Sequence, residues 1–240
     1  MSEAVTDPVV LLPGLLCDHR LYAAQLPALE ARGDVLVGDL TRVDTVAGLA
    51  EQILAQSPAH FALAGLSMGG YVAFEILRRA PERVTRLALL DTQARADTEE
   101  AKARRRGLME LAEKGEFKGV TPRLLPLFVH PEALADPHIT ATVASMAEST
   151  GKDAFLRQQR AIMGRPDSRA GLPAISCPTL VLAGREDQLT PMELQLEMAG
   201  LIPDATLVLI PRCGHLAPLE RPDAVTRQLL AWLDARDRSP

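Results

Sequence analysis

The chain has 240 residues, of which 47% are hydrophobic and 24% charged, fractions typical of globular proteins with a sizeable core. Its net charge of −5 and the lack of any run of ~18 apolar residues give no reason to expect a nucleic acid or a membrane as partner. An N-terminus without a basic segment and three widely spaced cysteines, Cys17, Cys177 and Cys213, predict a cytoplasmic protein with free thiols.

Six short apolar runs predict the strands of a sheet. They cover residues 9–12, 35–37, 61–64, 84–90, 179–183 and 206–210. Each is almost continuously apolar, which is typical of strands buried on both faces of a parallel sheet. Helix-like stretches alternate with them, over residues 21–31, 46–56, 68–80, 191–200 and 222–234. The alternation predicts an α/β fold with a doubly wound parallel sheet.

One segment interrupts this alternation. Residues 94–171 contain no convincing strand, and their apolar residues follow helical spacing. A helical insertion between two strands of such a sheet predicts a lid over its carboxyl edge, where the active sites of these folds lie. A helical subdomain with a purely structural role is the alternative. We therefore expect an α/β core of residues 1–93 and 172–240 and a helical lid of residues 94–171.

The pentapeptide Gly65-Leu66-Ser67-Met68-Gly69 lies directly between a predicted strand and a predicted helix. In that context a G-x-S-x-G sequence indicates a sharp turn whose glycines leave room for neighbouring backbone. The turn raises the serine hydroxyl above the sheet and directs the first N–H groups of the helix toward it. Ser67 is therefore the candidate nucleophile, and an ordinary tight turn is the alternative interpretation.

A serine nucleophile needs a base and a group that orients the base. His215 follows the strand predicted at 206–210 by a short loop, so it is expected at the same sheet edge as Ser67. The other histidines lack this placement: His19, His60, His130 and His138. Asp187, after the strand predicted at 179–183, is our choice for the orienting acid. Three rival acids also follow predicted strands: Glu186, Asp91 and Asp39.

Acyl transfer also needs N–H donors for the oxyanion. Met68 directly follows the nucleophile at a helix N-terminus and is expected to supply one of them. The second is expected in the loop after the first strand, where Gly14 permits a turn. Leu15 is our choice for this donor, and Leu16 is the alternative and a candidate substrate contact.

In order and spacing, several motifs resemble those of the α/β-hydrolase superfamily, in particular its compact bacterial group of 3-oxoadipate enol-lactonases, cofactor-free haloperoxidases (perhydrolases) and small carboxylesterases. The motifs include Leu12-Pro13-Gly14-Leu15, Gly65-Leu66-Ser67-Met68-Gly69-Gly70, Gly184-Arg185-Glu186-Asp187 and Gly214-His215-Leu216. The chain order Ser67, Asp187, His215 is also the order of these hydrolases. The resemblance covers nearly the whole chain.

The chain departs from this family in three places. The loop after Asp39 lacks the Gly-x-Gly of the relatives, so this side of the pocket is less predictable. Pro13 stands where the family usually has a histidine, so a somewhat altered oxyanion loop is expected. Only eight residues precede the first predicted strand, where larger relatives have two further strands. We therefore expect six strands, all parallel, in an α/β-hydrolase fold that lacks its first two strands.

The resemblance implies a serine hydrolase that cleaves a small ester, lactone or thioester through an acyl-enzyme on Ser67, as a monomer or homodimer, with no cofactor and no metal. Perhydrolysis, C–C bond hydrolysis and lyase chemistry use the same three residues and stay as alternatives. A ligand receptor on a hydrolase scaffold is a further alternative function. Cys213 lies two residues before His215, but without further ligands nearby it indicates a buried thiol rather than a metal site.

Two groups of basic residues lie in the predicted lid. Glutamates intersperse the first group, which indicates a solvated face with ion pairs: Lys102, Arg104, Arg105 and Arg106. In the second group, Arg157 and Arg160 are the candidates for an inward-facing cation. Such a cation would bind a substrate carboxylate, as the likeness to lactonases implies.

Overall fold

The structure, a computed structural model, describes residues 7–235 of the chain. Residues 1–6, on which the expectation about the N-terminal segment rests, lie outside the described residues. Within residues 7–235, no helix combines the length and the apolar character that crossing a membrane would require.

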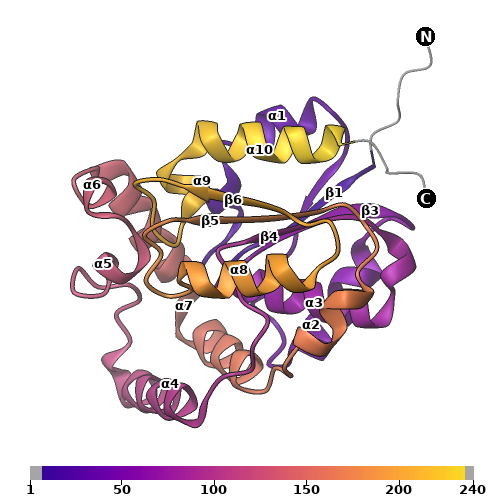
Figure 1. Ribbon diagram of the computed structural model, residues 1–240. Coiled ribbons are helices and arrows are strands. Elements are labelled where there is room, and N and C mark those ends of the chain that lie inside the picture. Colours follow the sequence, from indigo (N-terminus) through magenta and orange to yellow (C-terminus); the bar gives the residue numbers. More distant parts are fainter. Residues whose placement is uncertain (1–6, 236–240) are drawn as a thin grey trace.

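A six-stranded sheet forms the centre of the molecule (Figure 1). The strands are β1 (Val9–Leu12), β2 (Val35–Val37), β3 (Phe61–Leu66), β4 (Val84–Leu90), β5 (Thr179–Gly184) and β6 (Thr206–Ile210). Their order across the sheet is β2-β1-β3-β4-β5-β6, and every neighbouring pair is parallel. The prediction of six parallel strands is therefore confirmed. Strand β3 runs two residues further than predicted and so ends directly before Ser67.

Helices cover both faces of the sheet (Figure 1). One face carries α2 (Val46–Gln56), α3 (Met68–Arg79) and α8 (Met192–Leu201), and the other carries α1 (Leu26–Glu30) and α10 (Pro222–Asp234). Successive residues of β3 alternate between the two cores: Phe61 and Leu63 pack on the α3 side, and Ala62 and Ala64 on the α10 side. Side chains of a strand point alternately to opposite faces, so a sheet covered on both sides needs apolar residues at every position.

The chain between β4 and β5 is helical, as predicted. Its helices are α4 (Glu99–Leu111), which continues into a π-helical turn (Ala112–Glu116), then α5 (Leu125–Phe128), α6 (Pro131–Leu134), α7 (Pro137–Met163) and a 3₁₀ turn (Arg169–Ala174). Gly151, at φ 75°, interrupts α7 with a kink. Helices α4–α7 lie together at one side of the sheet (Figure 1). Residues 94–171 are called the helical insertion below.

The helix predicted over residues 21–31 is instead two short pieces. A 3₁₀ turn covers His19–Tyr22, and Asp18 caps it by accepting the N–H of Arg20 at 3.0 Å. Pro27 lies in the first turn of α1, the part of a helix that tolerates proline. The one-turn helix α9 (Ala217–Glu220), just after His215, has no counterpart in the prediction.

Candidate active site

Ser67 forms the turn between β3 and α3, with φ 52° and ψ −112°. A positive φ is strained for a residue with a side chain, and such strain costs on the order of 1–3 kcal/mol. The flanking glycines make the turn sterically possible. A Cβ on Gly65 would lie 2.5 Å from the Gly69 oxygen, and one on Gly69 would lie 2.2 Å from the Leu12 oxygen. The G-x-S-x-G pattern is therefore required here by the close approach of backbone segments.

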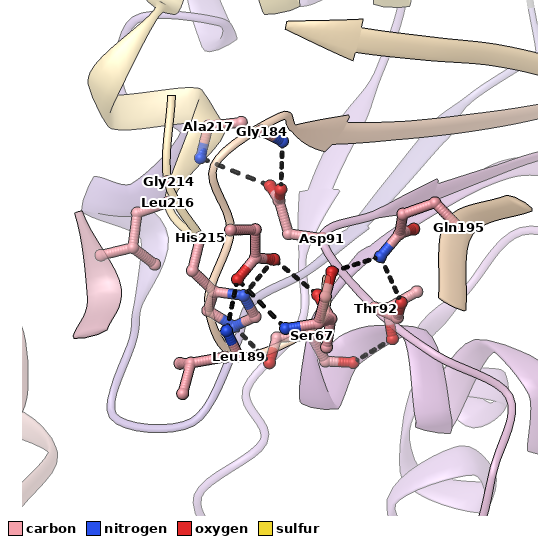
Figure 2. Close-up of polar contacts among 12 residues, drawn as sticks. Ser67, Asp91, Thr92, Gly184, Leu189, Gln195, Gly214, His215, Leu216 and Ala217 are labelled. Atoms are coloured by element: carbon pink, nitrogen blue, oxygen red, sulfur yellow. Dashed lines mark hydrogen bonds and ion pairs between the residues drawn. The ribbon is translucent and has the colours of Figure 1, made fainter. Parts of the chain in front are cut away.

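The structure brings Ser67, His215 and Asp187 together. Figure 2 shows Ser67 beside His215. The Oγ of Ser67 lies 2.9 Å from Nε2 of His215, whose Nδ1 lies 2.8 Å from Oδ2 of Asp187. An ionised carboxylate only accepts hydrogen bonds, so Nδ1 carries the proton and Nε2 is left as an acceptor for the serine hydroxyl. This arrangement is the one that a nucleophile, a base and an orienting acid require.

Asp187 is buried, and its carboxylate is fully hydrogen-bonded. Its Oδ1 accepts the N–H groups of Leu189 and Thr190 at 2.8 and 3.1 Å, and its Oδ2 accepts the Thr190 hydroxyl at 2.5 Å in addition to His215. Burial raises the pKa of Asp187, but the interactions with His215 and Thr190 outweigh it and leave the pKa below the usual value. The acid is therefore held in the ionised form that orients His215.

The three rival acids have other partners. Glu186 accepts the N–H of Cys213, and Asp39 pairs with Arg42. Asp91 is fully buried at the end of β4 and accepts the N–H groups of Gly184, at 2.8 Å, and Ala217, at 3.4 Å (Figure 2). Burial, with added repulsion from Asp187, raises the pKa of Asp91 well above its usual range.

A second buried acid, Glu220, holds the loop that carries His215. Its carboxylate accepts the N–H groups of Gly214 and Leu216 in the loop and that of His130 in the helical insertion, at 3.0, 3.1 and 2.7 Å. The N–H of His215 itself donates to the Phe128 oxygen at 2.9 Å. Sequence reasoning assigned Glu220 no role, because nothing in a single sequence shows that a glutamate after this histidine folds back under it.

The remaining histidines lie elsewhere. His19, His60 and His138 are exposed, and the ring of His130 accepts the N–H of Glu132 at the start of α6. None of these four is hydrogen-bonded to Ser67 within the part of the chain that the structure describes.

Two backbone N–H groups near Ser67 are open to an oxyanion. The N–H of Leu16 donates to Oε1 of Gln158 at 3.1 Å, so Leu16 is not free to serve as the second donor. Among residues 7–235, the N–H groups of Leu15 and Met68 have no hydrogen-bond partner. Met68 opens α3, where the helix dipole and the unpaired N–H groups favour a negative charge. Of the three candidate N–H groups, those of the predicted pair, Leu15 and Met68, are thus without a hydrogen-bond partner among the described residues, whereas that of Leu16 has one.

A cavity of about 460 Å³ opens beside Ser67 and His215. One wall comes from the loop after β1, including Leu15 and Leu16. The opposite wall comes from the helical insertion and is mainly apolar: Leu108, Leu111, Phe117, Leu124, Leu127 and Phe155. The cavity is therefore suited to a small, largely apolar ligand.

The expectation of an inward-facing Arg157 or Arg160 needs correction, since neither residue lines this cavity. Nε of Arg157 donates to the Thr41 oxygen at 2.7 Å, and Arg160 lies 3.9 Å from Glu113. Between them, Gln158 and Gln159 occupy the buried face of α7. The cations that do line the cavity come from the other basic group and its surroundings: Arg104, Arg105 and Lys118.

No group of three or more metal-ligating side chains occurs within residues 7–235. Cys213, the thiol closest in sequence to His215, is buried and unpaired, as is Cys17. Burial raises the pKa of Cys17 to about 12, so its thiol stays protonated and unreactive at neutral pH.

Comparison with known proteins matches residues 8–228 to the model of a family described as the alpha/beta hydrolase family. A thermophilic esterase from Thermogutta terrifontis, solved with malate bound, is 32% identical, with a TM-score of 0.85 over 94% of this chain and 89% of that chain. The enol-lactonase from Burkholderia xenovorans LB400 shares the fold at 24% identity, with a TM-score of 0.87 over 98% of this chain and 94% of that chain.

A curated relative, the dihydrolipoyllysine-residue acetyltransferase component of an acetoin cleaving system from Pseudomonas putida, is 29% identical over 92% of this chain. The match spans only 58% of that relative's length.

Proposed function

Because the chain belongs to the alpha/beta hydrolase family, we propose that it is a serine hydrolase that cleaves a small ester, lactone or thioester through an acyl-enzyme on Ser67. One observation carries the proposal: Ser67, His215 and Asp187 form a continuous hydrogen-bonded series, with distances of 2.9 and 2.8 Å. The likeness to an esterase at 32% identity supports the ester class.

The reaction follows from the positions of these groups. Nε2 of His215 takes the proton of the Ser67 hydroxyl as Oγ attacks the acyl carbon, and the oxyanion that forms lies against the N–H groups of Leu15 and Met68. The resulting imidazolium donates its proton to the leaving alcohol or thiol. A water molecule, deprotonated by His215, then attacks the acyl-enzyme, and the acid leaves as Ser67 regains its proton.

Asp187 acts through His215. Its ionised carboxylate keeps the proton on Nδ1 and stabilises the imidazolium that forms in both steps. The lowered pKa of Asp187 supports this role, because the acid stays charged well below neutral pH. Thr190 and Leu189 keep the carboxylate in place through their hydrogen bonds.

We assign the helical insertion, residues 94–171, as a lid over a core formed by residues 1–93 and 172–240. Two observations support it. The insertion supplies most of the apolar wall of the cavity beside Ser67. It is also bonded to the histidine loop through the Phe128 oxygen and the His130 N–H. A change in the insertion would therefore alter both substrate fit and the position of His215.

A fluorophosphonate probe followed by peptide mass spectrometry tests the proposal. We expect labelling of Ser67 in the wild-type protein, none in Ser67→Ala, and a labelling rate at least ~10³-fold lower in His215→Ala. Ser57→Ala is the matched control, because the hydroxyl of this serine donates to the Ile53 oxygen at the end of α2. An unlabelled wild-type protein, or His215→Ala labelled at the wild-type rate, would contradict the proposal and favour a ligand receptor.

A further inference from the structure

The wall of the cavity is not apolar throughout. Several side chains that line it carry hydrogen-bond donors with no partner among residues 7–235, and three of them are the Tyr71 hydroxyl, Nε2 of Gln159 and Nη2 of Arg105. Tyr71 is on α3, one helical turn after Ser67, whereas Arg105 is on α4 and Gln159 on α7. The two helices of the insertion lie side by side (Figure 1).

Gln159 is only 1% exposed, yet it lines the cavity. Its Oε1 accepts a hydrogen bond from Nη1 of Arg105 at 2.9 Å. Because arginine can only donate, this contact fixes which end of the amide faces Arg105 and leaves the NH₂ group toward the cavity. This NH₂ group has no partner among residues 7–235 and is not enclosed by protein atoms, so an acceptor group of a ligand in the cavity can reach it.

The cavity lining around Arg105 and Gln159 carries a net positive charge. Asp97 is the acid among the described residues that line the cavity. It is shared between Nε of Arg105, at 2.6 Å, and Nη1 of the buried Arg165, at 2.8 Å. Two guanidinium groups thus surround one carboxylate. The Arg165 guanidinium also lies 4.0 Å from the centre of the Tyr71 ring, which joins Tyr71 to the same network. Arg104 and Lys118 add two further cations to the lining.

We propose that Tyr71, Arg105 and Gln159 form a subsite for a carboxylate at the far end of the substrate's acyl group, so that the preferred substrates are monoesters of dicarboxylic acids. This inference rests on the proposed function. A carboxylate offers only acceptors, which match three unpaired donors beside an excess of positive charge.

The test compares p-nitrophenyl monoesters of glutaric, adipic and suberic acids with their neutral methyl diesters. We expect the wild type to show a kcat/KM at least tenfold higher for the adipic half-ester than for its methyl diester. In Arg105→Gln this preference should fall at least tenfold, because the loss in kcat/KM is larger for the half-ester than for the neutral diester. Arg106→Gln is the matched control, because this neighbour on α4 is exposed and lies near Glu99 instead.

Gln159→Met and Tyr71→Phe give independent variants in case Arg105→Gln does not fold, and each should lower the preference for the half-ester several-fold. Binding of adipate to Ser67→Ala, measured by titration calorimetry, provides a readout that needs no turnover. Adipate binding that is lost when Arg105→Gln is added supports the subsite even if no ester is hydrolysed, and then only the hydrolase proposal fails. Equal kcat/KM for half-ester and diester, or adipate binding unaffected by Arg105→Gln, overturns the subsite alone.

Discussion

Replacing Gln158 by leucine should lower kcat without a comparable change in KM. This side chain is fully buried in α7 and reaches two loops of the core. Its Oε1 accepts the N–H of Leu16 at 3.1 Å, and its Nε2 donates to the Leu40 oxygen at 3.2 Å. Leu16 is held at φ 59°, a strained conformation for leucine, directly after the proposed oxyanion donor Leu15. Gln158 is therefore a positioning residue for the oxyanion loop.

The structure also sets the expected size of the effect. Leucine leaves a buried N–H and a buried carbonyl oxygen unsatisfied, at about 1–3 kcal/mol each, so we expect a loss of about 3 kcal/mol in the free energy of unfolding after partial relaxation. Release of the strain at Leu16 would move the Leu15 N–H away from the oxyanion. Loss of one such donor lowers kcat about 10²–10³-fold, so a fall of about 10²-fold is expected.

Steady-state kinetics on p-nitrophenyl acetate and urea unfolding measure the two quantities. Gln52→Leu is the control, because Gln52, on α2, donates one hydrogen bond to the Asp39 oxygen and, among the described residues, has none to the loop that carries Leu15 and Leu16. It should lose about 1 kcal/mol of stability with kcat unchanged. If Gln158→Leu is destabilised as expected but retains kcat within twofold, its role is structural only and the reasoning is refuted.

Three further variants test other parts of the site. Between the ordinary and the raised pKa of Asp91, the folded protein binds a proton that the unfolded chain releases, so the free energy of unfolding falls as pH rises. Asp91→Asn should flatten this fall, measured by urea unfolding from pH 4.5 to 9. Wild-type and variant curves that run parallel would contradict the prediction. Gly65→Ala should lower the free energy of unfolding by about 3 kcal/mol or more, because the Cβ of the alanine would lie 2.5 Å from the Gly69 oxygen. A melting temperature equal to that of the wild type would count against this. Asp187→Asn should lower kcat about 10⁴-fold, whereas a tenfold loss would assign the orienting role elsewhere.

The sheet and the contacts at Ser67 were open to prediction because their signals are local. Buried parallel strands are continuous apolar runs, and a residue directly after such a run must lie at the carboxyl edge, which placed Ser67, Asp187 and His215 together. The short segment before β2 was not predictable in the same way. There the Asp18 cap and the position of Pro27 divided what hydrophobic spacing alone indicated as one helix.

The sequence did not show which basic residues of the helical insertion point toward the cavity. The kink at Gly151 resets the helical phase of α7, and after it Gln158 and Gln159 face the core while Arg157 and Arg160 do not. Two amides in the buried stripe of a helix give no apolar signal, although each has a partner supplied by a distant segment. Such partners come from tertiary packing and leave no local pattern.

The two helices that share the proposed carboxylate subsite are unequally anchored. Helix α4, all of which is described, contains no buried residue, whereas α7 contributes Phe155, Leu156, Gln158 and others to the interior. Few buried contacts mean that local opening of α4 costs little free energy. An anion bound by both Arg105 and Gln159 would strengthen the link between the two helices, which a single hydrogen bond between these side chains already makes. Recognition of the substrate and closure of the pocket would then be a single event, and the dicarboxylic acid product would leave at the rate at which α4 lifts away.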